Sequence, residues 1–181
     1  LRRAARAYRE AIALRPDEPV SYINLGAVLD DAGHDVEAAQ RYLEAKERFP
    51  VGSEHWAEAT ASAFDMLRQK ECAEVAKPEW WNDEGLKALS ARVVRAAPDD
   101  VAAYIMRAVA LSGHYSAREV GPRSVVELKE AATHNERAAA LHPAQAMKAQ
   151  LVSWADRCSR LAESHVNELR IVSLCHPSII L

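Results

Sequence analysis

The sequence is poor in the features that define secreted, disulfide-bonded and membrane-spanning proteins. It contains 3 cysteines in 181 residues, Cys72, Cys158 and Cys175, without a CxxC pair, so it lacks a disulfide framework. No stretch approaches the roughly 18 consecutive apolar residues that a transmembrane helix requires. We therefore expect an intracellular protein of a reducing compartment, either cytoplasmic or organellar, without a membrane span.

The sequence also lacks a basic surplus and the motifs of common catalytic and metal sites. Its net charge is −3 at pH 7, which argues against a nucleic-acid partner. The 6 glycines form no Walker loop, dinucleotide fingerprint or nucleophile elbow, and the 7 histidines form no HxxxH or HExxH pair. We expect no metal, no cofactor and no catalytic residue, so the chain is not predicted to be an enzyme.

Alanine is what the sequence has in excess. There are 35 alanines, hydrophobic residues make up 49% of the chain, and aromatic residues only 6%. The 8 prolines fall between periodic apolar segments rather than inside them. Strong helix formers separated by helix breakers predict an all-α fold in which small side chains let the helices approach closely.

Two of these prolines, Pro16 and Pro50, lie 34 residues apart, which is the period of a helical hairpin repeat. The residues at the key positions of that period are Tyr22, Leu25, Gly26, Leu29, Ala38, Tyr42, Ala45 and Pro50, and the second half of the pattern recurs in Ala4, Tyr8, Ala11 and Pro16. Residues 1–50 therefore resemble tetratricopeptide (TPR) repeats. The resemblance implies a TPR-like α-solenoid of antiparallel helical hairpins that binds other proteins.

The residue types of the pattern have a physical meaning of their own. Gly26 and Ala38 are small because two helices are expected to cross there, and a larger side chain would force the backbones apart. Tyr22, Leu25 and Leu29 form one apolar stripe at helical spacing. Because a single hairpin leaves this stripe open to water, we expect several hairpins to stack.

The repeat continues beyond Pro50 with insertions, because Pro98 follows after 48 residues and Pro143 after a further 45. We predict one domain over residues 1–170. It comprises a half repeat (1–18), a full repeat (19–52), two expanded repeats (53–100 and 101–145) and a long C-terminal capping helix (146–170), and an apolar tail follows at 171–181.

Local signals set the expected helices of the expanded repeats. One helix should cover about 53–76, and Asn82 should open its partner, with Leu86, Leu89, Val93 and Val94 facing the core. A loop should run from Gly113 to Pro122, before a capping box at Ser124–Glu127 starts a helix that ends near Leu141. The last helix should carry Met147, Leu151, Trp154, Cys158 and Leu161 on one face. Trp80 and Trp81 are expected at a helix start, either packed in the core or anchoring a partner.

Two further segments, Trp80–Leu89 and Leu128–His134, resemble a divergent, Ala-rich TPR-like family of microalgal proteins. That resemblance implies an origin and a fold but no activity.

Both ends of the chain carry expectations of their own. Leu1–Leu14 is predicted to be the second helix of a hairpin whose first helix is missing. We expect that the natural chain continues upstream or that another polypeptide packs on Tyr8 and Leu14. The tail is expected to fold back on the solenoid, or else to dock into a partner groove or a membrane surface.

TPR proteins that bind the acidic C-termini of chaperones use a clamp of lysine, asparagine and arginine residues. Only Asn24 matches an element of this clamp, and Glu54 and Glu58 stand where it needs basic residues. Two carboxylates would repel an acidic peptide, so this class of ligand is disfavoured.

The geometry of TPR-like stacks implies a concave face lined by the first helix of each hairpin. The residues brought to that face are Asn24, Ala27, Asp31, Glu54, Glu58, Asp65, Ile105 and Val109. They predict a protein-interaction scaffold whose client carries Lys or Arg at one end and apolar side chains at the other. The alternatives are that the carboxylates only solvate this face, or that the chain is a fixed structural subunit of a large complex.

Overall fold

A computed structural model gives the fold as a stack of helical hairpins. It describes the backbone of residues 1–114 and 122–175, and the side chains of 1–114 and 122–167. The elements are α1 (Arg2–Leu14), α2 (Pro19–Asp30), α3 (Asp35–Arg48), α4 (Glu54–Leu67), the 3-10 helix η1 (Lys70–Cys72), α5 (Asp83–Ala96), α6 (Val101–Ser112), α7 (Val125–Leu141) and α8 (Gln145–Cys175). No strand occurs in the described residues.

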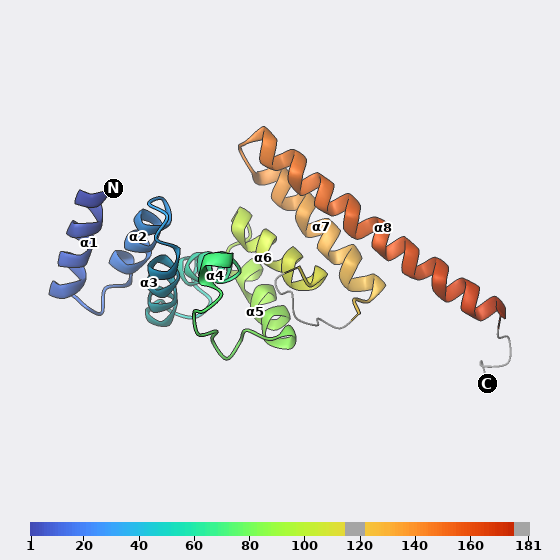
Figure 1. Ribbon diagram of the computed structural model, residues 1–181, viewed down its shortest axis with the longest axis horizontal. Coiled ribbons are helices and arrows are strands. Elements are labelled where there is room, and N and C mark those ends of the chain that lie inside the picture. Colours follow the sequence, from blue (N-terminus) through green and yellow to red (C-terminus); the bar gives the residue numbers. More distant parts are fainter. Residues whose placement is uncertain (115–121, 176–181) are drawn as a thin grey trace.

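The hairpins follow one another along the long axis of the molecule, from α1 at one end to α7 and α8 at the other (Figure 1). The protein is therefore an all-α, TPR-like α-solenoid, as the sequence predicts. The links between α3 and α4, α5 and α6, and α7 and α8 lie close to the expected repeat boundaries at residues 52, 100 and 145. The division of the chain into those four repeats stays a prediction.

The first complete hairpin, α2 and α3, depends on a close helix crossing. A Cβ atom built on Gly26 would lie 2.8 Å from Cε1 of Tyr42, and Ala38 is fully buried. The space that a larger residue at position 26 would need is thus filled by the Tyr42 ring. The apolar stripe of Tyr22, Leu25 and Leu29 is buried, so the predicted stacking is confirmed.

The N-terminal helix α1 packs on α2 and covers part of its apolar side. Tyr8 is half-buried against the chain's own core, whereas Leu14 is 81% exposed. Of the two residues expected to need a cover, Tyr8 already has one within this chain. Leu14 alone keeps the open apolar surface that the sequence predicts.

The helix expected over 53–76 is wrong in its last nine residues, 68–76, because α4 ends at Leu67. The chain then turns through η1, which packs against α3 and buries Cys72 completely. The Lys77 ammonium donates hydrogen bonds to the carbonyl oxygens of Leu67 (2.6 Å) and Cys72 (2.9 Å). A cation at these carbonyls satisfies acceptors that a helix end leaves open, which stabilises the early stop.

Trp80 and Trp81 lie in the turn before α5 rather than on a helix start, so that expectation was wrong. Both are half-buried against the core, and the Trp81 ring lies 5.4 Å from that of Phe64. α5 begins only at Asp83. Its N-cap residue is Asn82, whose Oδ1 atom accepts a hydrogen bond from the Gly85 amide. The pair therefore packs as core, which was one of the two expected roles.

The α5 start also explains a glycine that the sequence pattern leaves unexplained. A Cβ atom on Gly85 would lie 2.6 Å from the carbonyl oxygen of Trp80. The contact is with backbone, which cannot move aside as a flexible side chain can. Gly85 is therefore required for the tight turn that brings the tryptophans onto the core.

The second half of the solenoid follows its sequence signals closely. Asp100 caps the start of α6. The residue after its last turn, Gly113, adopts a left-handed conformation with φ of 78° and ends the helix. α7 starts with the predicted capping box of Ser124 and Glu127 and ends, as expected, at Leu141. Most of the expected loop from Gly113 to Pro122 lies outside the described residues.

Ion pairs join α5 to the start of α7. The Lys87 ammonium lies 2.6 Å from a Glu127 carboxylate oxygen and 2.8 Å from one of Asp83. The Arg123 guanidinium, whose side chain is only 7% exposed, lies 2.6 Å from Asp83 Oδ1. These contacts hold the α4–α5 hairpin against the α6–α7 hairpin.

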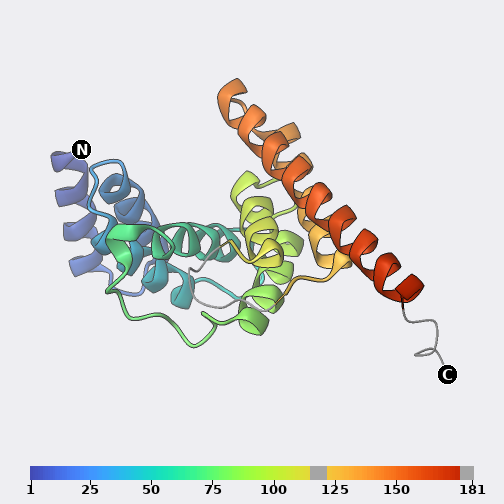
Figure 2. The same cartoon turned by 45° about the vertical axis from the view of Figure 1, so that its right-hand side comes forward.

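The last helix, α8, packs along α7 and projects past it toward the C-terminus (Figures 1 and 2). Its buried positions are Leu151, Ala155, Cys158 and Ala162. Leu161, which we expected on this face, is 38% exposed, because the helical period brings Ala162 inward instead. The expected tail at 171–181 is wrong in its first part, since α8 runs on to Cys175; residues 176–181 lie outside the described residues.

Acid should weaken the α5–α7 contact. Burial raises the pKa of Glu127, but hydrogen bonds from Lys87 and Ser124 outweigh burial and lower it to about 2, from a usual 4.5. A depressed carboxyl pKa stabilises the fold above pH 4.5, and this stabilisation is lost as the pH falls toward 2. Glu127→Gln should cost about 1 to 2 kcal/mol at pH 7, measured by urea denaturation. An equal cost at pH 7 and pH 2.5 would contradict this account.

Gly85→Ala should destabilise the protein by about 1 to 3 kcal/mol, because the added methyl meets the Trp80 backbone. The measurement is the free energy of unfolding, with tryptophan fluorescence reporting on Trp80 and Trp81. Ala88→Ser, at an exposed position of the same helix, is the control, and it should lower the free energy of unfolding by much less than Gly85→Ala does. A neutral or stabilising Gly85→Ala variant would refute the required close approach.

Candidate functional site

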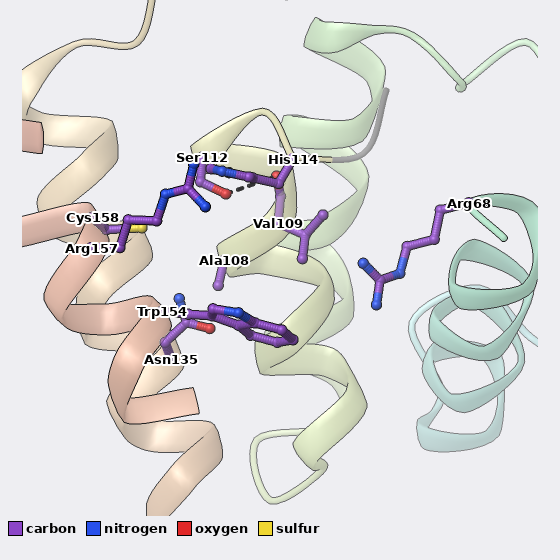
Figure 3. A pocket seen from close by; sticks show the side chains of 9 residues that line it. All are labelled: Arg68, Ala108, Val109, Ser112, His114, Asn135, Trp154, Arg157 and Cys158. Carbon is purple, nitrogen blue, oxygen red and sulfur yellow. Dashed lines mark hydrogen bonds between the residues drawn. The ribbon is translucent and has the colours of Figure 1, made fainter. Parts of the chain in front are cut away.

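Two adjoining cavities lie between α4, α6 and α8. The first, of about 230 Å³, is lined by Arg68, Ala108, Val109, Ser112, His114, Asn135, Trp154, Arg157 and Cys158 (Figure 3). The second, of about 220 Å³, is lined by Asp30, Ala61, Ser62, Phe64, Asp65, Met66, Arg68, Ala102, Ile105, Met106, Met147 and Trp154. Because Arg68 and Trp154 line both, the cavities form one depression, which we call the α6 cleft.

Apolar side chains form the middle of the α6 cleft. Ile105 and Val109 follow each other along α6 at helical spacing, and Met106 lies beside them, 1% exposed. Trp154 extends from α8 toward α6 and forms a wall common to both cavities (Figure 3). This arrangement can bury apolar side chains or a flat ring.

Carboxylates gather at the end of the cleft that borders α2. Burial raises the pKa of Asp30, and the negative charges of Asp65, Asp35 and Asp31 raise it further. Burial, followed by Asp30, Asp31, Glu58 and Asp65, likewise raises the pKa of the nearby Tyr42 hydroxyl. The part of each pKa shift that comes from the neighbouring carboxylates, in addition to the effect of burial, corresponds to a negative local potential. This end of the cleft therefore favours a cation.

Cations gather at the opposite end, which borders α8. The Arg157 guanidinium lies beside Ser112 and His114, while Arg68 reaches in from α4 on the other side (Figure 3). Burial lowers the pKa of His114, and the positive charges of Arg157 and Arg123 lower it further. Between the two ends, Arg68 Nε donates to Asp65 Oδ1 at 2.7 Å. The cleft thus changes sign along its length.

Asn135 is the unusual polar residue of the first cavity. It is 3% exposed, and its Oδ1 atom is enclosed without a hydrogen-bond donor among the residues that the structure describes. A buried acceptor left without a donor costs about 1 to 3 kcal/mol. Asn135 stands where a TPR repeat has an aromatic residue, so a polar side chain at a core position was the sequence signal for this cavity.

The structure brings only part of the predicted site together. Asp65 and Ile105 line the second cavity, and Val109 lines the first. Asp31 lines a separate cavity between α1 and α2. Asn24 is half-buried on α2, Ala27, Glu54 and Glu58 are exposed, and none of these four lines either cavity of the α6 cleft.

Sequence reasoning missed the basic and aromatic members of the cleft. Arg68 falls inside the longer helix expected over 53–76, Trp154 lies on the expected core face of the last helix, and His114 belongs to no motif. Arg157 was not singled out, since one exposed arginine on a long helix carries no pattern. Only the packing of α8 against α6 and α7 brings these residues together.

Other kinds of site find little support in the described part of the chain. It holds no group of three or more His, Cys, Asp or Glu side chains placed to share a metal ion. Cys72 and Cys158 are buried free thiols, and burial raises the pKa of each, which disfavours a reactive thiolate. Over the same residues, no helix combines the length and hydrophobicity that a bilayer crossing demands.

Comparisons with known proteins identify the fold. No family model matches the chain, and no curated protein matches it in sequence. Solved structures that resemble it include one described as MamA protein and one described as MamA. The first is 14% identical to this chain with a TM-score of 0.55, and the match covers 98% of this chain and 85% of that structure's chain. The second is 13% identical with a TM-score of 0.51, and the match covers 92% of this chain and 88% of that structure's chain. These likenesses support a TPR-like helical-repeat fold and do not extend to function.

Replacing Asn135 by leucine should stabilise the protein by about 1 kcal/mol, because it removes an acceptor that lacks a donor. The first cavity leaves room for the larger side chain. The free energy of unfolding from urea denaturation is the measurement, and Asn167→Leu at an exposed position of α8 is the control. A loss of stability in Asn135→Leu would mean that this amide is satisfied in solution.

Proposed function

We propose that the chain is a non-catalytic protein-interaction scaffold that binds an extended or helical segment of a partner protein in the α6 cleft. The observation that carries the proposal is the origin of the cleft residues. The second cavity is lined from α2, α4 and α6, which are the first helices of three successive hairpins, and from α8. In stacked helical repeats, such helices create an extended concave surface on which partners bind.

The charges of the cleft set the chemistry of the partner. Asp30 and Asp65 favour a Lys or Arg side chain at the end of the cleft that borders α2. Ile105 and Met106 favour apolar side chains in the middle of the cleft, along α6. Charge attraction then steers the segment, and apolar burial holds it. Because the second cavity measures only about 220 Å³, it suits one or two anchoring side chains rather than a folded surface.

The remaining predicted residues form the proposed outer part of the site. Glu54 is the first residue of α4, and Glu58 lies about one turn further on; both are exposed, and Glu58 also contacts His55 at 3.3 Å. Asn24 and Asp31 lie on α2 and at its C-cap. We propose that these residues extend the acidic end of the cleft toward solvent and contact the basic end of the partner segment.

The proposal is tested with two fluorescent 12-residue peptides that share an apolar half. One carries three lysines at its N-terminal end, and the other carries three glutamates there. The lysine peptide should bind more tightly, and added salt should weaken its binding. Glu54→Lys combined with Glu58→Lys should weaken it by about three- to tenfold at low salt without changing helicity.

The matched control is Glu136→Lys combined with Glu163→Lys, which makes the same change in net charge at exposed positions of α7 and α8. It should leave the affinity of the lysine peptide close to that of the wild type. Equal weakening in both double variants would show that only net charge matters. An unchanged affinity in both would contradict the proposed face and direct attention to the convex face or to residues 113–123.

A further inference from the structure

The first cavity of the α6 cleft has the dimensions of a small-molecule site. Its volume of about 230 Å³ exceeds the roughly 150 Å³ that holds benzene in an apolar cavity. It falls below the roughly 300 to 1,000 Å³ of sites for drug-sized ligands. One ring with one small substituent therefore fits the space.

The walls of this cavity suit a flat ring. The Trp154 indole from α8 forms one side, and Ala108 and Val109 from α6 lie opposite it (Figure 3). A planar ring placed against an indole gains both apolar contact and favourable ring–ring geometry. An aliphatic ligand would gain the contact alone, so the walls favour an aromatic group.

The charges at the cavity favour an anion. Among the described residues, no acidic side chain lines it, whereas the guanidinium groups of Arg68 and Arg157 do. His114 also lines it, but burial and the charge of Arg157 lower its pKa, which favours the neutral imidazole. Arg68 pairs with Asp65, which belongs to the second cavity, and Arg157 forms no ion pair with any residue in the described part of the chain. A guanidinium presents two parallel donors that match the oxygens of a carboxylate or phosphate.

Asn135 adds one polar group to the back of the cavity. The residue is 97% buried, and its Oδ1 atom is fully enclosed without a donor among the described residues, so a ligand in the cavity does not reach this atom. The Nδ2 atom is not enclosed in this way, which leaves the amide N–H as the group that can meet a ligand. An amide N–H donates, so it suits an oxygen carried by the ligand.

We propose that the first cavity binds a small aromatic anion. Its ring lies between Trp154 and Val109, its carboxylate or phosphate meets the Arg157 guanidinium, and a ring hydroxyl oxygen accepts a hydrogen bond from the Asn135 Nδ2 amide group. This site shares Arg68 and Trp154 with the second cavity, where the partner segment is proposed to bind, but none of its other lining residues. It requires no second copy of the chain and no metal.

The indole N–H signals of the four tryptophans allow a direct NMR test, with 4-hydroxybenzoate and phenyl phosphate as anionic probes and 4-hydroxybenzamide as the neutral one. The Trp154 signal should move and saturate with 4-hydroxybenzoate at a Kd of about 1 mM. The signals of Trp56, Trp80 and Trp81 should stay in place. The relative affinities of the two anions decide between a carboxylate and a phosphate ligand.

Two variants separate a specific site from general attraction. Arg157→Gln should lower the affinity for 4-hydroxybenzoate about tenfold. Arg160→Gln, at an exposed position of α8 outside the cavity, should leave this affinity unchanged. Asn135→Leu should lower the affinity for 4-hydroxybenzoate to that for benzoate, which lacks the ring hydroxyl. The proposal is overturned if neither anion moves the Trp154 signal at about 20 mM. It is also overturned if the benzamide binds as tightly as the benzoate, or if both arginine variants behave alike.

Discussion

Each helical hairpin of this chain carries an apolar stripe that only the next hairpin can cover. The stripe can be covered only where helices approach closely, and small residues make that approach possible. Gly26 admits the Tyr42 ring, and fully buried alanines such as Ala38, Ala57 and Ala103 recur along the stack. Since aromatic residues are scarce, the core is built from many small contacts rather than a few large ones. The stacked, solenoid form of the chain follows from this constraint.

The cleft arises where the regular stacking changes. α4 stops at Leu67, the chain detours through η1 and the tryptophan turn, and α8 then lies along α7 as a single long helix. The early stop places Arg68 at the end of α4, where its side chain reaches toward Trp154 of α8. Residues from the two halves of the solenoid thus share one cleft, with carboxylates on one side and guanidinium groups on the other.

Much of the fold could be predicted from local sequence signals, because those signals act over a few residues. The 34-residue spacing of Pro16 and Pro50, the capping box at Ser124 and the glycine stop at Gly113 all have local causes. The stop at Leu67 could not be predicted, since it depends on Lys77 folding back onto helix carbonyls ten residues earlier. The exposure of Leu161 depends on how α8 rotates against α7.

The candidate site could be predicted only where it belongs to the repeat pattern. Asp65, Ile105 and Val109 were reached because they occupy the first helices of hairpins. Arg157 and Trp154 come from the helix that closes the stack, and Asn135 from a second helix, so no repeat rule leads to them. Sequence periodicity therefore found one wall of the cleft, and tertiary packing supplied the other.

The central claim is that partners bind on the first helices of the hairpins, at the α6 cleft. Amide hydrogen exchange of the whole chain, with and without the lysine-bearing peptide, tests it most directly. The account predicts slower exchange in the second half of α4, in α6 and in the Met147–Trp154 part of α8, with α3, α5 and α7 unchanged. Slower exchange confined to α3, α5 or α7 would place the partner on the opposite face and contradict the account.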